Sequence, residues 1–380
     1  MAAVRERDDV ARWPDGDGFV FPVERLGDFL VWACSIGASD VALQSARPAY
    51  VEVDGVLRRA TRVRLDTPTL VRIVSNVYGA TGEGVLRSGH ALDCSHEVRG
   101  EAGRRHRFRV NVSAVQVRGA FGINVTLRVL PGIPPELEAL GVEPEVVEAC
   151  LRCRGLTLVT GVPGSGKSTL LAAVTRRLLE RGVGRIQSYE APIEFVFDEV
   201  DQGDALMSAS EIPVHFGSFA EGLRSSLRRR PSVVVVGEAR DRETVEAVVH
   251  AADFGIAVFS TAHTVGVAQT LRRMVVEFRP GEREERAAAL VDLLNVVVTQ
   301  VLVPAAHGGR TALREWLVFE RAMKDALLEL PLDRWAGRIS AWVEARGQTM
   351  AQQAERAFEA GRIRAAERMR LAGRAREDVA

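Results

Sequence analysis

The sequence lacks several features that would assign it to a protein class at once. No apolar run approaches the roughly 18 residues that a membrane-spanning helix needs, so we expect no direct membrane insertion. Residues 1–9 mix charges and have no apolar core, unlike a secretory signal peptide. Lys+Arg and Asp+Glu are both 50, whereas a nucleic-acid binder normally has a basic excess, so nucleic acid is not an expected partner. These absences predict a cytoplasmic protein that reaches a membrane through other proteins.

Cysteine is also scarce. The four cysteines, Cys34, Cys94, Cys150 and Cys153, are too few for a disulfide framework in 380 residues. Cys150 and Cys153 form a lone C-x-x-C, and no second C-x-x-C or H-x-x-x-H supplies the remaining ligands of a zinc site. We therefore expect no zinc, and we place this pair where a helix ends before the next strand.

What the chain does have is a phosphate-binding motif. Residues 161–169 read G-V-P-G-S-G-K-S-T and fit G-x-x-x-x-G-K-[ST], the phosphate loop of nucleoside triphosphatases. The apolar residues 156–160 before it are typical of a buried strand, and apolar residues at helical spacing follow it. Glycines let backbone N–H groups close around phosphates, and a helix N-terminus adds its positive dipole end.

The motif therefore predicts that the chain binds ATP or GTP together with Mg²⁺. Lys167 would neutralise charge on the β- and γ-phosphates, and Ser168 would ligate the Mg²⁺. The other nucleotide-binding residues that the motif predicts are Gly161, Gly164, Ser165, Gly166 and Thr169.

Composition and turn residues divide the chain into five segments. In order, we predict a flexible N-terminus, an α+β domain, a Pro/Gly-rich hinge, a nucleotide-binding domain and a helical C-terminal region. Their bounds are 1–20, 21–130, 131–135, 136–320 and 321–380.

Apolar strands alternate with helical patterns through the nucleotide-binding segment, which is typical of a parallel sheet covered by helices. The strands predicted there are 156–160, 185–189, 233–236 and 257–261. The α+β segment shows helical patterns at 26–36 and 67–78 and strand patterns at 50–53, 107–112 and 123–129.

Three of the predicted parallel strands are followed by polar residues. Glu190 follows one strand, Glu238 follows four valines and a glycine in the manner of a Walker B segment, and His263 follows the last strand. Because the carboxyl ends of parallel strands meet at one sheet edge, we expect all three beside the phosphate loop. There they could supply a water-orienting base, a partner for the metal or its water, and a γ-phosphate contact.

In this order the motifs resemble the GspE/PilT superfamily of secretion and pilus-retraction ATPases, and most of all its DotB and TraJ branch of type IVB secretion and plasmid transfer. The resemblance covers nearly the whole chain. The similar segments are 37–41, 53–57, 107–111, 189–195, 218–241, 260–264, 307–315 and 347–363.

The resemblance implies an α/β fold with an N-terminal PAS-like α+β domain, a RecA-like P-loop ATPase domain and a helical C-terminal tail, assembled as a homohexamer. Glu190 would orient the attacking water, Glu238 would serve the Mg²⁺ and its water shell, and His263 would sense the γ-phosphate. The roles of the two glutamates could also be exchanged. Arg109 and Arg128 are candidate arginine fingers, although ordinary surface ion pairs would explain them equally well.

The chain departs from the family at a few positions. Pro163 stands where the family often has Thr, Ile256 where it often has His, and Ala262 where it often has Leu. None of these changes removes a phosphate ligand. The four-cysteine zinc module of the pilus-extension and type II secretion ATPases is absent, which favours the retraction-like and type IVB branches.

The expected function is that of a hexameric cytoplasmic ATPase that powers a type IV secretion or conjugation apparatus of the Dot/Icm kind. Inner-membrane proteins of the secretion or pilus apparatus would recruit it peripherally. One alternative is a PilT-like motor for type IV pilus retraction. Alternatives from other classes are a nucleic-acid motor on a RecA-like core and a small-molecule kinase, against which stand the neutral charge and the additional N-terminal domain.

Overall fold

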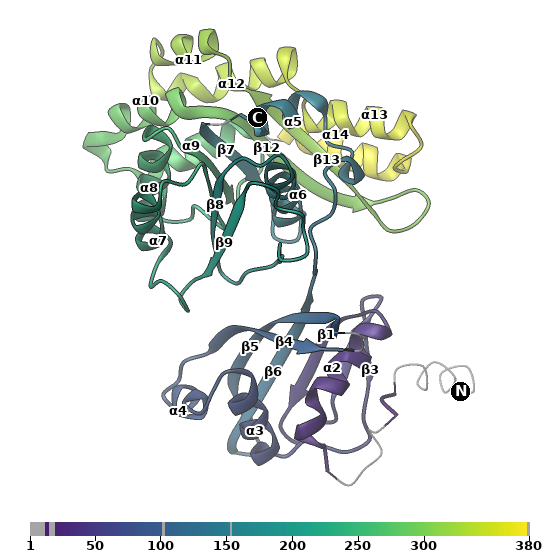
Figure 1. The fold of residues 1–380 in the computed structure, drawn as a ribbon. Helices are drawn as coiled ribbons and strands as arrows, with labels where there is room; N and C mark the ends of the chain where they lie inside the picture. Colours follow the sequence, from purple (N-terminus) through teal and green to yellow (C-terminus); the bar gives the residue numbers. More distant parts are fainter. Residues whose placement is uncertain (1–11, 15–19, 101–102, 153, 378–380) are drawn as a thin grey trace. The chain divides into compact units, whose positions relative to one another are not determined.

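A computed structural model describes residues 12–14, 20–100, 103–152 and 154–377 (Figure 1). Most of the predicted flexible N-terminus, 1–20, lies outside these described residues, as does Cys153. Contacts divide the chain into two units, Met1–Gly132 and Ile133–Ala380, and each unit has its own hydrophobic core.

The first unit is an antiparallel sheet with helices packed on one face. Its strand order is β3-β2-β1-β6-β5-β4. The strands are β1 (Ala38–Gln44), β2 (Tyr50–Val53), β3 (Val56–Arg59), β4 (Leu92–Arg99), β5 (Arg105–Val117) and β6 (Ala120–Leu130). The helices are α2 (Leu26–Ser35), α3 (Thr67–Val77) and α4 (Gly82–Arg87).

The sequence of this unit accounts for its one-sided core. In β5, Phe108, Val110 and Val112 are buried, and the residues between them are exposed, as expected for a strand with one solvated face. The buried face packs against apolar residues of α2 and α3. Helix α3 begins where the Asp66 carboxylate accepts a hydrogen bond from the Thr69 N–H at 2.8 Å, a typical N-cap.

The second unit is built on a seven-stranded sheet of order β13-β12-β7-β11-β10-β8-β9. The strands are β7 (Gly155–Thr160), β8 (Arg185–Glu190), β9 (Leu206–Glu211), β10 (Val233–Val236), β11 (Ala257–Ala262), β12 (Leu294–Pro304) and β13 (Arg310–Val318). The four strands predicted in this region are confirmed to within one residue at each end.

The prediction of a parallel sheet holds from β12 to β9 and is wrong at the edge strand β13. This strand runs antiparallel to β12, from Val318 opposite Val296 to Arg310 opposite Pro304. The reason is a short connection, because Gly308 and Gly309 both have positive φ and turn the chain straight back. A parallel neighbour would have needed a long crossover segment.

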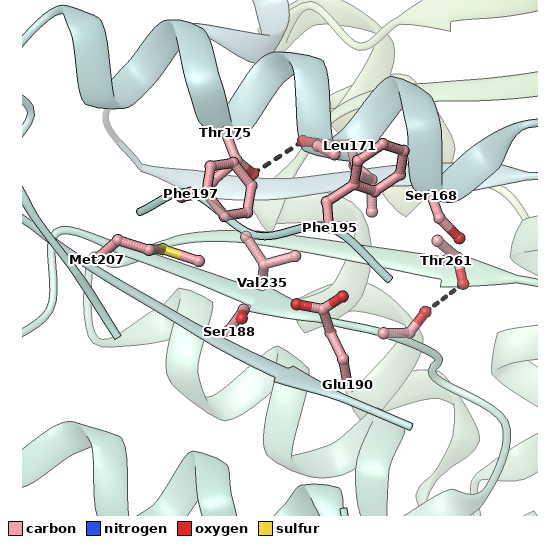
Figure 2. A pocket seen from close by; sticks show the side chains of 12 residues that line it. Ser168, Leu171, Thr175, Ser188, Glu190, Phe195, Phe197, Met207, Val235 and Thr261 are labelled. Carbon is pink, nitrogen blue, oxygen red and sulfur yellow. Dashed lines mark hydrogen bonds between the residues drawn. The ribbon is translucent and has the colours of Figure 1, made fainter. Parts of the chain in front are cut away.

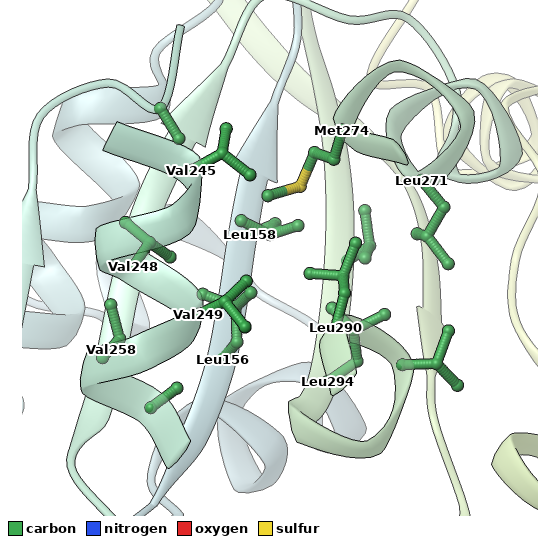
Figure 3. Packing of buried hydrophobic residues seen from close by; sticks show 14 of the residues in the cluster. Leu156, Leu158, Val245, Val248, Val249, Val258, Leu271, Met274, Leu290 and Leu294 are labelled. Atoms are coloured by element: carbon green, nitrogen blue, oxygen red, sulfur yellow. The ribbon is translucent and has the colours of Figure 1, made fainter. Parts of the chain in front are cut away.

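Helices cover both faces of this sheet. They are α5 (Pro144–Cys150), α6 (Lys167–Glu180), α7 (Phe219–Ser226), α8 (Arg242–Asp253), α9 (Val267–Glu277), α10 (Arg283–Leu293), α11 (Arg321–Leu328), α12 (Leu332–Arg346), α13 (Met350–Glu359) and α14 (Ala365–Glu377). One core holds α7 to α12, and the core on the other face holds α5 and α6. Figure 3 shows α8 valines facing Leu156 and Leu158 of β7.

The two last helices pack on the β12–β13 hairpin. Ala354 and Ala357 of α13 and Leu371 of α14 bury Val303 and Leu313 in a small separate cluster. The C-terminal helices are therefore part of the second unit. Among the described helices, none combines the length and the apolar composition that a membrane span requires.

Cys150 lies at the end of α5, shortly before β7, where the sequence predicted a helix end. Its side chain is buried, and that burial raises the pKa of the thiol to about 12. Such a thiol stays protonated at neutral pH and is a poor metal ligand or nucleophile.

The helix-covered core gives a direct stability prediction. Leu290 of α10 is fully buried, so Leu290→Ala should lower the free energy of unfolding by about 2–5 kcal/mol through lost burial and a cavity. Leu328 of α11 is 43% exposed, so Leu328→Ala should change the free energy of unfolding by less than about 0.5 kcal/mol. Urea unfolding followed by circular dichroism compares the two variants, and equal losses would contradict this packing.

Candidate functional site

The phosphate loop connects β7 to α6, as the motif predicted. Gly161, Gly164 and Gly166 have φ values of 140°, 76° and 85°, which glycine adopts without steric cost. A Cβ on Gly161 would lie 2.3 Å from the Gln300 carbonyl oxygen, so a side chain has no room there. The backbone forms a concave anion-binding loop at the N-terminus of α6.

Lys167 is the cation of this loop, and its side chain is buried. Its Nζ donates to the carbonyl oxygens of Gly161 at 2.7 Å and Val162 at 3.1 Å. Burial lowers the pKa of Lys167, and the carboxylates of Glu238 and Glu194 oppose that shift. Carbonyl groups carry only partial charges, so a phosphate anion would hold this ammonium more strongly than the loop itself does.

Ser168 and Glu190 share a cavity of about 40 Å³ between α6 and the sheet (Figure 2). In Figure 2, Ser168 projects from α6, while Glu190 extends from the end of β8. The Glu190 carboxylate accepts a hydrogen bond from the Glu194 N–H at 3.4 Å. The Ser188 hydroxyl, also in the cavity wall, is buried without a hydrogen-bond partner. The cavity thus joins the predicted metal ligand Ser168 to a carboxylate.

Glu238 and His263 form a second group around Lys167. His263 Nε2 lies 3.5 Å from Glu238 Oε1, and its Nδ1 lies 3.3 Å from Lys167 Nζ. β11 pairs with β10 and β7, and this parallel register sets the strand ends side by side. The structure therefore brings the loop lysine, both glutamates and the histidine to one edge of the sheet, as the sequence predicted.

Arg109 and Arg128 belong to the first unit and lie opposite each other on β5 and β6. Arg128 is 69% exposed, and its Nε donates to the Asp40 carboxylate at 2.9 Å, so the ion-pair interpretation applies to it directly. Arg109 is exposed and makes no ion pair within the described residues. Their role as arginine fingers stays a prediction.

Sequence reasoning missed a chain of buried and half-buried threonine hydroxyls beside the loop. Thr160, the last residue of β7, hydrogen-bonds Thr299 of β12 at 2.8 Å and accepts from Thr270 of α9 at 3.4 Å. Thr270 in turn pairs with Thr264, next to His263, at 2.6 Å. Threonine is common in strands, so single threonines gave no signal in the sequence.

The residues present fit a Mg²⁺ ion that is held mainly by a nucleotide. Within the described ranges, no group of three or more His, Cys, Asp and Glu side chains could hold a metal. Mg²⁺ commonly uses one or two protein oxygens together with waters and substrate phosphates. The Ser168 hydroxyl, which lines the same cavity as the Glu190 carboxylate, matches that donor set.

Comparison with known proteins gives consistent matches. The family model described as Type II/IV secretion system protein matches residues 27–376. The type IV pilus retraction ATPase PilT of Pseudomonas aeruginosa is 33% identical over 304 residues, which cover 80% of this chain and 85% of that protein.

Two solved structures share the fold. The X-ray structure of the Legionella pneumophila ATPase DotB is 37% identical, with a TM-score of 0.82, and the match covers 95% of this chain and 98% of that one. The crystal structure of the pilus retraction motor PilT with bound ADP is 31% identical, with a TM-score of 0.77 and coverage of 91% and 96%.

The loop geometry predicts the effect of removing its cation. Lys167→Ala should reduce ATP hydrolysis to background, because the buried ammonium no longer stabilises charge on the phosphates. Lys324, the only other lysine of the chain, is a matched control, and Lys324→Ala should keep wild-type turnover. A phosphate-release assay compares them. Wild-type turnover by Lys167→Ala would mean that the nucleotide site lies elsewhere.

Proposed function

The chain belongs to the Type II/IV secretion system protein family, and from that premise we propose that it is an ATP-driven motor of a type IV secretion or conjugation apparatus of the Dot/Icm kind. It is an ATPase, in common with its relatives PilT and DotB. The observation that carries the proposal is the convergence of Lys167, Glu238 and His263 beside a glycine loop. Similarity to DotB along 95% of the chain supports the choice of apparatus.

The proposed architecture follows the same relatives. Residues 21–130 would form a PAS-like domain, 131–135 a hinge, 136–320 a RecA-like ATPase domain and 321–380 its helical tail. Six copies would form a ring that inner-membrane proteins of the apparatus recruit peripherally. The crystal structure of PilT with bound ADP supports adenosine nucleotides as the ligand of the loop.

Each residue of the site has a proposed role in hydrolysis. Lys167 holds the β- and γ-phosphates, and Ser168 holds the Mg²⁺, which neutralises phosphate charge when bound. Glu190 lies in the cavity beside Ser168 and orients the attacking water. Glu238, whose carboxylate faces Lys167 and His263, supports the metal shell. His263 contacts the γ-phosphate.

A motor for type IV pilus retraction is the second candidate. It is supported by the 33% identity to PilT of Pseudomonas aeruginosa and by the likeness to the PilT crystal structure. Both candidates use the same site and differ in the machine that the ring serves. A nucleic-acid motor is a third class, and stimulation of hydrolysis by single-stranded DNA would favour it.

The two glutamates can be separated by experiment. Glu190→Gln keeps the size of the side chain but removes the charge that orients water, so ATP should still bind while hydrolysis falls by orders of magnitude. Glu238→Gln should instead raise the Mg²⁺ concentration needed for half-maximal rate. Nucleotide titrations and phosphate release under matched conditions measure both effects. Loss of nucleotide binding by Glu190→Gln, with an unchanged rate per bound ATP, would show that Glu190 is structural.

If six copies form a ring, and if Arg109 and Arg128 act as arginine fingers, ATP turnover should depend on assembly of the ring. Specific activity should rise with protein concentration as rings form, and Arg109→Ala with Arg128→Ala should remove that rise while the protein stays folded. Arg→Lys at these positions should not restore the full rate, because lysine lacks the planar guanidinium fork. Light scattering measures the mass of the assembly at each protein concentration used in the activity assay. A constant specific activity down to monomer concentrations would contradict both proposals.

A further inference from the structure

A buried glutamine lies under the phosphate loop. Gln300 is in the apolar strand β12 and is 3% exposed. Its Nε2 donates to the Ser165 carbonyl oxygen at 2.7 Å. A Cβ on Gly166 would meet the same Nε2 at 2.8 Å, and a Cβ on Gly161 would meet the Gln300 carbonyl oxygen at 2.3 Å. Gln300 therefore packs against the phosphate loop both at Gly161 and at Ser165–Gly166.

The hydrogen bond to Ser165 fixes the orientation of one loop peptide. In a planar trans peptide the C=O of Ser165 and the N–H of Gly166 point in opposite directions. Because Gln300 holds that carbonyl on the β12 side, the Gly166 N–H is directed to the other side of the loop. Gly166 has φ 85°, and glycine also accepts negative φ, so its own backbone preference does not prevent the peptide from flipping. A flipped peptide would present a carbonyl to the phosphates.

Arg314 in turn fixes Gln300. The two residues are paired across β12 and β13, and Arg314 is 1% exposed. Its Nε donates to Gln300 Oε1 at 2.9 Å, which leaves the amide N–H₂ of Gln300 facing the loop. The other guanidinium nitrogens donate to the carbonyls of Gly141 at 3.1 Å and Leu140 at 3.0 Å.

The network of polar contacts around Arg314 extends to the C-terminal helices. The Glu143 carboxylate lies 3.7 Å from Arg314 and accepts hydrogen bonds from Gln353 at 2.7 Å and Gln348 at 3.2 Å. Gln348 also donates to the Arg314 carbonyl at 3.2 Å. Buried and partly buried hydrogen bonds thus join the loop, residues 140–143 and the start of α13, and buried polar groups are costly to leave unpaired.

We propose that Gln300 and Arg314 are positioning residues of the phosphate loop, which hold the Ser165–Gly166 peptide in its phosphate-binding orientation and couple nucleotide affinity to residues 140–143 and α13. Gln300 contacts the loop backbone and Arg314 contacts Gln300, so in this proposal both residues act on the nucleotide through the loop. The inference rests on the proposed function, because it concerns the nucleotide site of the same loop.

Gln300→Glu is the sharpest test, because it separates folding from loop orientation. The carboxylate keeps the shape and can still accept from Arg314, but it cannot donate to Ser165. It also places a negative charge behind the phosphate site. The thermal midpoint without nucleotide should stay within a few degrees of wild type. Affinity for a fluorescent ADP analogue should fall about tenfold or more, because one buried hydrogen bond is lost and a negative charge is added.

Arg314→Lys provides an independent variant, since it keeps a positive charge beside Glu143 but loses the guanidinium fork. We expect a several-fold loss of affinity for the same analogue and a raised KM for ATP, with kcat less affected. Gln187, another buried glutamine in the same sheet, is the matched control, and Gln187→Met should bind like wild type.

Three outcomes decide the inference. Weaker binding by Gln300→Glu or Arg314→Lys, with folding retained, supports it. Wild-type affinity within twofold for whichever of these variants folds would overturn it and leave the proposed function standing. Failure of the wild-type chain itself to bind the ADP analogue would remove the proposed function, and this inference with it.

Discussion

The phosphate loop lies close against β12, and this packing determines the geometry of the site. Gly161 and Gly166 lie against Gln300, so a side chain at either position would collide with that residue. With the Ser165 carbonyl held on the β12 side, the Gly166 N–H faces the opposite side, where α6 also directs its N-terminal dipole. An anion-binding loop with a buried lysine follows from this packing.

Parallel pairing supplies the remaining groups. β8, β10, β11 and β7 are neighbours in register, and their ends carry Glu190, Glu238, His263 and the loop at one sheet edge. A buried ammonium is tolerated there because carboxylates face it and carbonyl oxygens accept hydrogen bonds from it. In the proposed mechanism the same carboxylates orient water and a metal once phosphates occupy the loop.

Much of this arrangement could be predicted from the sequence, because it is encoded locally. The loop motif, the strand of four valines and the polar residues after each strand are short patterns with a known geometry. The contacts that Gln300 and Arg314 make behind the loop could not be predicted in this way, because they join residues that lie far apart in the sequence. Gln300 and Ser165 are 135 positions apart, and Arg314 reaches Leu140 across 174. The one visible signal was a polar Gln300 within an apolar strand, and it does not reveal its partner.

Hydrolysis of ATP at the loop, without transfer of the phosphoryl group to another molecule, is the activity on which the proposed motor depends. The direct measurement is product analysis after incubation of the purified protein with γ-labelled ATP and Mg²⁺. We expect the label to appear as free phosphate without any added acceptor, and chelation of Mg²⁺ to stop its release. Label found on a small-molecule acceptor, or unchanged ATP at protein concentrations where rings form, would contradict it.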